Sequence, residues 1–140
     1  MTENYINDGP APFGSFLFFD TETTGLPKNY NAPISDLGNW PRVVQIAWAI
    51  YGADGTELQA SEHIIRPDGF LIPQAATSLH GITTSFAREN GIELRDALQK
   101  FSQAVSPVKI LVGHNIAFDE NILGAEFLRC KMDCLCAKKS

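Results

Sequence analysis

A short apolar run that ends abruptly in polar residues constrains the fold of this 140-residue chain more than any other feature. Residues 15–19 read Ser-Phe-Leu-Phe-Phe, and the next six residues read Asp-Thr-Glu-Thr-Thr-Gly. A nearly continuous apolar run of this length is typical of a strand that is buried on both faces. Ligand sites in open α/β sheets usually lie where such strands end. The segment therefore predicts a buried strand with a candidate site at its end.

The rest of the chain predicts two more strands, then three helices, then a strand and a helix. Ala53-Asp54-Gly55 is a tight hairpin signal between the second and third strands. Two apolar helical faces follow, one with Leu94, Leu98, Phe101 and Val105 and one with Phe118, Ile122, Ala125, Leu128 and Met132. The predicted strands cover 15–19, 43–51, 56–66 and 108–113. The predicted helices cover 72–79, 84–90, 94–106 and 117 onwards, with Asn115 as N-cap of the last. This order is typical of an α/β domain with a mixed sheet.

Length and composition indicate one domain, with residues 1–12 as a flexible lead-in and residues 13–140 as the folded part. The apolar runs are far too short for a membrane span, and no secretory signal is visible, so we expect a cytoplasmic protein. Cys130, Cys134 and Cys136 are odd in number and lack paired C-x2-C spacing, which indicates reduced thiols rather than disulfides or a zinc site.

The charge balance bears on the kind of partner. The chain has 16 acidic and 11 basic residues, for a formal net charge of −5. Proteins that hold nucleic acid purely by neutralising phosphates are strongly basic. If the partner is polyanionic, a metal ion is the obvious source of positive charge, whereas the simpler alternative is an acidic surface that keeps the protein soluble.

Asp20 and Glu22 are the first candidate site residues. Side chains two residues apart in a strand share a face, so both carboxylates can converge on one point, and such oxygen ligands suit Mg²⁺ or Mn²⁺. Sixteen acids predict roughly two acid-x-acid pairs by chance, so the pair alone favours a solvated strand end. Asp119 lies in the first turn of a predicted helix, where the helix dipole favours an acid regardless of function.

Four segments in order strengthen the case: FFDTETTG, RVVQIAW, LHGIT and GHNIAFDENIL. From about residue 15 to the end, the chain resembles the DnaQ-like, DEDDh-type branch of the DEDD 3′–5′ exonucleases, which includes the proofreading epsilon subunit of bacterial DNA polymerase III. The resemblance implies an RNase H-like fold, in which three antiparallel strands precede parallel strands with crossing helices. It also implies hydrolysis at 3′ ends of single-stranded DNA or RNA, with a DNA polymerase as a candidate partner.

The resemblance assigns roles to individual residues. Asp20, Glu22 and Asp119 match the catalytic acids that hold two Mg²⁺ or Mn²⁺ ions in a two-metal mechanism. The implied substrate-binding residues are Thr23, Thr24, Gly25, Leu26, His80, Asn115 and Phe118.

The chain departs from the family pattern after Asp119. The family continues with a histidine general base and, five residues later, a fourth aspartate. Here His63, His80 and His114 all precede Asp119, and we interpret His114 as a strand-end residue near the site with a hydrogen-bonding role. We therefore expect a domain whose C-terminal part is truncated and whose activity is weak or absent, because losing a proton-transfer group typically costs about 10²–10⁴-fold.

Two alternatives to an exonuclease domain stay open. One is a degenerate relative that binds metal or nucleic-acid ends without hydrolysis. The other is a structural module with a vestigial acidic cluster. The choice between DNA and RNA and the oligomeric state are also open from the sequence.

Overall fold

The computed structural model describes residues 14–133. The predicted lead-in at residues 1–12, and Cys134 and Cys136, lie outside the described residues. The elements are β1 (Phe16–Thr23), β2 (Val43–Tyr51), β3 (Glu57–Ile64), α1 (Gln74–His80), α2 (Thr84–Asn90), α3 (Leu94–Val105), β4 (Ile110–Val112) and α4 (Ile116–Arg129). Their order confirms the predicted succession of three strands, three helices, a strand and a helix.

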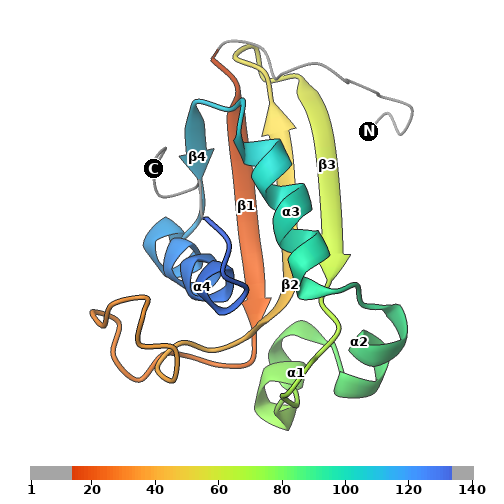
Figure 1. Cartoon of the computed structure of the whole chain (residues 1–140). Coiled ribbons are helices and arrows are strands. Elements are labelled where there is room, and N and C mark those ends of the chain that lie inside the picture. Colours follow the sequence, from red (N-terminus) through yellow and green to blue (C-terminus); the bar gives the residue numbers. More distant parts are fainter. Residues whose placement is uncertain (1–13, 134–140) are drawn as a thin grey trace.

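The four strands form one mixed sheet in the order β3-β2-β1-β4 (Figure 1). β1, β2 and β3 are antiparallel neighbours, whereas β4 is parallel to β1. The predicted hairpin at residues 53–55 joins β2 to β3, and Gly55 takes a φ of +88° there, which glycine adopts without strain. The mixed sheet predicted from the sequence is therefore confirmed.

One face of the sheet carries the main hydrophobic core. Leu17 and Phe19 of β1 point to this face because side chains alternate along a strand. They pack in one cluster with Phe101 of α3 and Phe127 of α4, and both helices lie over the same side of the sheet in Figure 1. Tight packing on this face fixes where β1 ends and where α4 begins, and hence the positions of the candidate acids.

The opposite face of the sheet is bare within the described residues. Phe18 is 44% exposed, and a hollow of about 560 Å³ is lined by apolar side chains that include Phe16 and Tyr51. The prediction that the first strand is buried on both faces is therefore wrong for residues 14–133. A continuous apolar run indicates that burial of both faces of the strand is favourable. It does not show that a helix or strand among residues 14–133 packs on each face.

Three smaller predictions need correction. β1 continues through Thr23, so Asp20 and Glu22 lie within the strand rather than after it, because the ladder to β2 continues as far as the bulge after Glu22. Leu128, assigned to the apolar face of α4, is exposed. Asn115 occupies the N-cap position of α4, but its side chain makes no capping hydrogen bond.

α1 and α2 form a small lobe at one end of the sheet (Figure 1). Gly81 ends α1 in the left-handed region with a φ of +81°, directly after His80. The Thr83 hydroxyl caps α2 by accepting the Phe86 N–H. This lobe brings His80 close to the end of β1. Within residues 14–133, no helix has the length and apolar character needed to cross a membrane.

Candidate active site

Asp20 and Glu22 project from the bare face of the sheet. They alternate with the buried Leu17, Phe19 and Thr21, and their cross-strand partners on β2 are Ala47 and Gln45. Asp20 also lines a second hollow of about 530 Å³, together with Phe18 and His114. The shared face predicted for the two carboxylates is therefore confirmed.

Asp119 lies in the first turn of α4 and is only 3% exposed. The hydroxyl of Thr21 donates a hydrogen bond of 2.6 Å to its Oδ1 atom. Burial raises the pKa of Asp119 to about 6, the Thr21 hydrogen bond opposes the rise, and the charges of Asp20 and Glu22 add to it. The structure thus brings the third acid within electrostatic reach of the other two.

The three acids do not form a ready-made metal cage. Among residues 14–133, no group of three His, Cys, Asp or Glu side chains is close enough to hold an ion. Thr21 points to the core side and holds Asp119 there, whereas Asp20 and Glu22 project from the other side of β1. Carboxylate oxygens are hard ligands, so the donor set fits a divalent cation such as Mg²⁺ or Mn²⁺ in its chemistry.

Backbone and hydroxyl hydrogen bonds fix the segment that follows the acids. Thr23 Oγ1 donates to the carbonyl of Gly25 at 2.8 Å. Thr24 and Arg42 exchange two bonds, from the Thr24 N–H to the Arg42 carbonyl at 2.9 Å and from the Arg42 N–H to Thr24 Oγ1 at 3.0 Å. Leu26, at the end of this segment, is 73% exposed. The four predicted substrate contacts at residues 23–26 therefore form one anchored segment with an exposed apolar side chain.

His80 contacts this anchored segment. Its Nε2 atom lies 3.2 Å from the carbonyl of Thr23, and its Nδ1 atom accepts the Ile82 N–H at 3.1 Å. Since Nδ1 is an acceptor, the neutral ring carries its proton on Nε2 and donates it to Thr23. His80 therefore lies against the segment that follows the candidate acids, and its role toward a substrate stays a prediction.

The other two histidines differ in position. His114 is exposed and lines the same hollow as Asp20, but it makes no hydrogen bond with residues 14–133, so the predicted hydrogen-bonding role has no partner among them. His63 stacks on Trp48 and lies 3.2 Å from Ser61 Oγ, away from the acids. Burial and then the charge of Lys100 lower its pKa.

Two further residues of α4 belong to the candidate substrate contacts. Asn115 is exposed at the start of the helix, and Phe118 packs against Tyr30 with ring centroids 6.3 Å apart. Tyr30 was missed in the sequence because it lies in the irregular loop after Gly25. Thr21 was also missed, although strand alternation alone places it on the face opposite Asp20 and Glu22.

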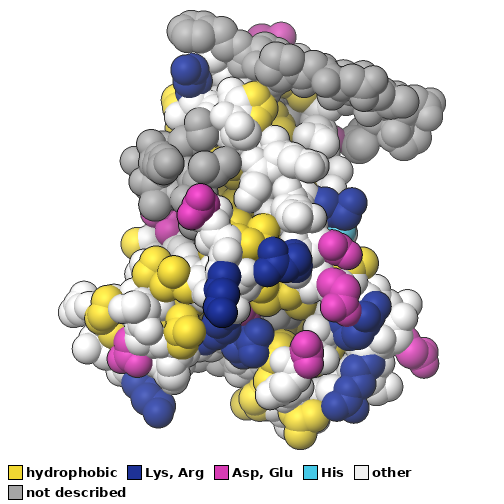
Figure 2. Space-filling view, viewed as in Figure 1, with side chains coloured by type: hydrophobic (Ala, Val, Ile, Leu, Met, Phe, Trp, Pro, Cys, Tyr) yellow, Lys and Arg dark blue, Asp and Glu magenta, His cyan; other side chains and the backbone are white. Residues whose placement is uncertain are grey.

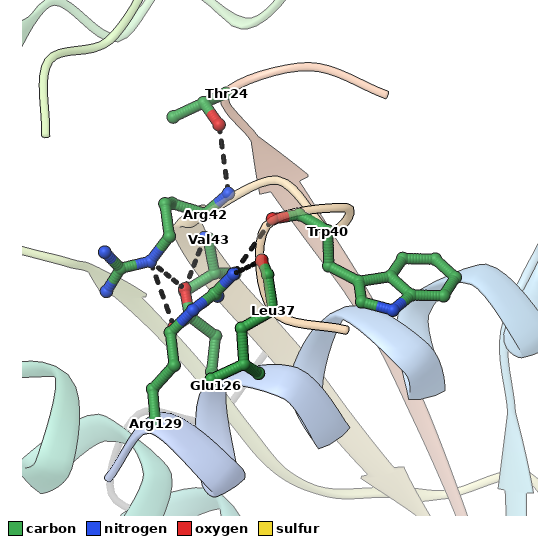
Figure 3. Close-up of polar contacts among 7 residues, drawn as sticks. All are labelled: Thr24, Leu37, Trp40, Arg42, Val43, Glu126 and Arg129. Carbon is green, nitrogen blue, oxygen red and sulfur yellow. Dashed lines mark hydrogen bonds and ion pairs between the residues drawn. The ribbon is translucent and has the colours of Figure 1, made fainter. Parts of the chain in front are cut away.

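A buried carboxylate anchors the loop between β1 and β2 (Figure 3). Glu126 of α4 accepts the Val43 N–H at 2.8 Å and pairs with Arg42 at 3.1 Å and Arg129 at 3.0 Å. Arg129 also donates to the carbonyls of Leu37 and Trp40 at 2.7 and 2.9 Å. Through Arg42 this network reaches Thr24. The sequence signal was available, because Glu126 and Arg129, three residues apart, are the only charged residues in the otherwise apolar second half of the helix, residues 122–129.

Comparison with protein families gives one matching model, described as Exonuclease, over residues 17–138. A DNA polymerase III PolC-type protein of Pediococcus pentosaceus is 28% identical over 93% of this chain and 9% of its own length. A DNA polymerase III subunit epsilon-like protein of Rhodobacter capsulatus is 32% identical over 92% of this chain and 16% of its own length. The chain therefore spans only a small part of these relatives.

Solved structures share the fold. E. coli exonuclease I in complex with a dT13 oligonucleotide superposes with a TM-score of 0.71 over 86% of this chain and 25% of that chain, at 23% identity. The structure titled exonuclease I (apo) gives a TM-score of 0.70 over 86% of this chain and 26% of that chain, at 23% identity. The predicted RNase H-like fold is confirmed by these neighbours.

Proposed function

Because the chain belongs to the exonuclease family whose model matches residues 17–138, we propose that residues 13–140 form a 3′–5′ exonuclease domain. It hydrolyses phosphodiester bonds at single-stranded 3′ ends, and Asp20, Glu22 and Asp119 hold two Mg²⁺ or Mn²⁺ ions. The observation that carries this proposal is the approach of the buried Asp119 to β1, where the hydroxyl of Thr21, between Asp20 and Glu22 in the sequence, donates a 2.6 Å hydrogen bond to its Oδ1 atom. The charges of Asp20 and Glu22 disfavour ionisation of Asp119, and a bound cation would offset that repulsion.

The chain's own residues hold and orient the substrate. Bound divalent ions would supply a more acidic water and a counter-charge for the leaving 3′ oxygen. Thr21 holds Asp119 in one rotamer, and the bonds between Thr24 and Arg42 hold the segment that carries the exposed Leu26 against the terminal nucleotide. His80 donates to the Thr23 carbonyl, so in this arrangement it positions the segment rather than accepting a proton.

The bare sheet face supports the proposal that the domain is incomplete. Apolar side chains and Asp20 line the same hollow, so a further layer of structure over this face would also close the acidic site. None of the described histidines is placed as a general base by its hydrogen bonds. We therefore propose that the 140-residue chain by itself hydrolyses DNA or RNA slowly. Its rate should be about 10²–10⁴-fold lower than that of a domain with a positioned general base.

A degenerate module that binds metal or nucleic-acid ends without catalysis is the second candidate. The absence of a three-ligand group among residues 14–133 favours it. The names of the PolC-type and epsilon-like relatives support the proposal that a DNA polymerase is the partner. We also propose that the protein is located in the cytoplasm.

Release of nucleotide from labelled oligonucleotides separates the two candidates. Single-stranded DNA and RNA carrying a label at the 3′ terminus are incubated with the chain and Mn²⁺ over hours. The exonuclease proposal predicts slow release of labelled mononucleotide that is lost in Asp119→Ala and retained in Asp96→Ala, a matched change of an exposed acid in the first turn of α3. Release that survives Asp119→Ala, or no release at all, would count against it.

A further inference from the structure

Four of the five arginines of this acidic chain line one pocket. Arg42, Arg66, Arg95 and Arg129 line a cavity of about 240 Å³ near the start of β2, the start of α3 and the end of α4, and Arg88 is the fifth. Figure 2 shows Lys and Arg side chains gathered over the middle of the corresponding face. In a chain of net charge −5, this concentration is not expected from composition alone.

Three of these arginines form ion pairs, but Arg42 and Arg129 share the carboxylate of Glu126, so the guanidinium groups outnumber their counter-charges. Arg95 donates to the carbonyl of Cys130, and Arg129 donates to two carbonyls, and carbonyls carry no net charge. The neighbouring carboxylates are Asp68, Glu93 and Glu126. Four guanidinium groups are thus accompanied by three carboxylates, which leaves a net positive charge of about one in the pocket.

Arg42 has donors to spare. In its guanidinium group only the Nε atom is engaged, by Glu126, and Nη1 and Nη2 donate to none of residues 14–133. The Cζ atom lies over the Phe70 ring, 4.6 Å from its centroid. Cys130 lines the same pocket; burial raises the pKa of its thiol, and the charges of Arg95, Arg42 and Arg129 oppose that rise. A planar fork with free donors is the geometry that suits a phosphate.

The pocket is physically joined to the candidate active site. Arg42 is hydrogen bonded through its backbone to Thr24, which belongs to the segment assigned to the terminal nucleotide. Asp119 and Arg129 lie at opposite ends of α4, ten residues and hence about 15 Å apart. A strand whose last nucleotide lies at the acids would reach the pocket with an internal phosphate.

We propose that this arginine pocket binds one backbone phosphate of the single strand whose 3′ end enters the acidic site, an inference that rests on the proposed function. Contacts of this kind fix the register of a strand and carry no sequence information. The pocket therefore supplies local positive charge that the rest of this acidic surface lacks.

Salt-dependent binding tests the proposal. An eight-nucleotide thymidine oligomer with a 5′ fluorophore is titrated with the full chain in EDTA, which prevents hydrolysis, between 50 and 200 mM NaCl. Each phosphate contact on a single strand contributes about 0.7 to the slope of log K against log salt. Arg95→Gln, at an exposed position of the pocket, should lower that slope by about 0.7, whereas Arg88→Gln, outside the pocket, should leave it unchanged.

The outcomes separate this proposal from the proposed function. Equal slopes for Arg95→Gln and Arg88→Gln, or no binding of the oligomer by the wild-type chain, would overturn the pocket assignment. NMR chemical shifts of the Nε–H groups of Arg42 and Arg95 provide a second test. Shifts that change on addition of inorganic phosphate but not on addition of the oligomer would also overturn the assignment, because the pocket would then bind free phosphate. Absence of metal-dependent nucleotide release, with the slope difference intact, would count against the proposed function alone.

Discussion

Asp119→Asn should stabilise the protein at neutral and alkaline pH. The Asp119 carboxyl is 3% exposed, and its pKa rises from 3.8 to about 6 on folding, chiefly because burial penalises its charge. The folded protein therefore holds this proton more tightly than the unfolded chain. Its stabilising effect is fully present below the unfolded pKa and is lost as the pH rises through the folded value. Two pKa units correspond to about 3 kcal/mol of stability lost above pH 6.

Asparagine removes the charge while its Oδ1 atom can still accept the Thr21 hydrogen bond. Chemical denaturation at a series of pH values measures the effect. The difference in unfolding free energy between Asp119→Asn and wild type should shift by roughly 2–3 kcal/mol in favour of the variant between pH 4 and pH 8, and it should stay level above about pH 7.

Asp96→Asn provides the matched control. Asp96 also lies in the first turn of a helix, but it is exposed, so its replacement should cost about 0.3–1 kcal/mol through loss of a favourable dipole interaction. The two variants therefore have opposite signs at pH 8. A stability difference between Asp119→Asn and wild type that does not vary between pH 4 and pH 8 would refute the account of the Asp119 environment.

Two further predictions concern packing and the loop anchor. In chemical denaturation, Phe19→Ala should lower the free energy of unfolding by about 3–5 kcal/mol, because Phe19 is buried in the core. Phe18→Ala, on the bare face, should lower it by less than about 1 kcal/mol. Equal losses for the two variants would show that the face is covered in solution. Glu126→Gln should lower the free energy of unfolding by about 3 kcal/mol, because it leaves Arg42 and Arg129 without their buried counter-charge. A loss below about 1 kcal/mol in the same assay would contradict the role of this network.

Much of the fold follows from local patterns. β2 matches its predicted bounds of Val43 to Tyr51, because Pro41 and Gly52 bracket a run of alternating buried residues. The face shared by Asp20 and Glu22 follows from the two-residue repeat of a strand. These features depend on neighbours in the sequence, which is why they were predictable.

The features that were missed depend on tertiary contacts. A run of apolar residues does not reveal that Phe18 lies on a face that none of residues 14–133 covers. Helix periodicity does not reveal that Leu128 is exposed while Glu126 is buried. The hydrogen bond between Thr21 and Asp119 joins residues 98 positions apart. The buried state of Asp119 and its altered pKa follow from that approach and were outside the reach of local patterns.

Mn²⁺ titration by calorimetry at pH 8 tests the central claim most directly, since the claim is that Asp20, Glu22 and Asp119 form a divalent-metal site. Glu62→Gln is the matched control, because Glu62 is an exposed carboxylate opposite Ala47 on the same sheet face as Asp20. The account predicts saturable Mn²⁺ binding by the wild-type chain and by Glu62→Gln, and its loss in Asp20→Asn. Binding by Asp20→Asn that equals binding by the wild type would contradict it.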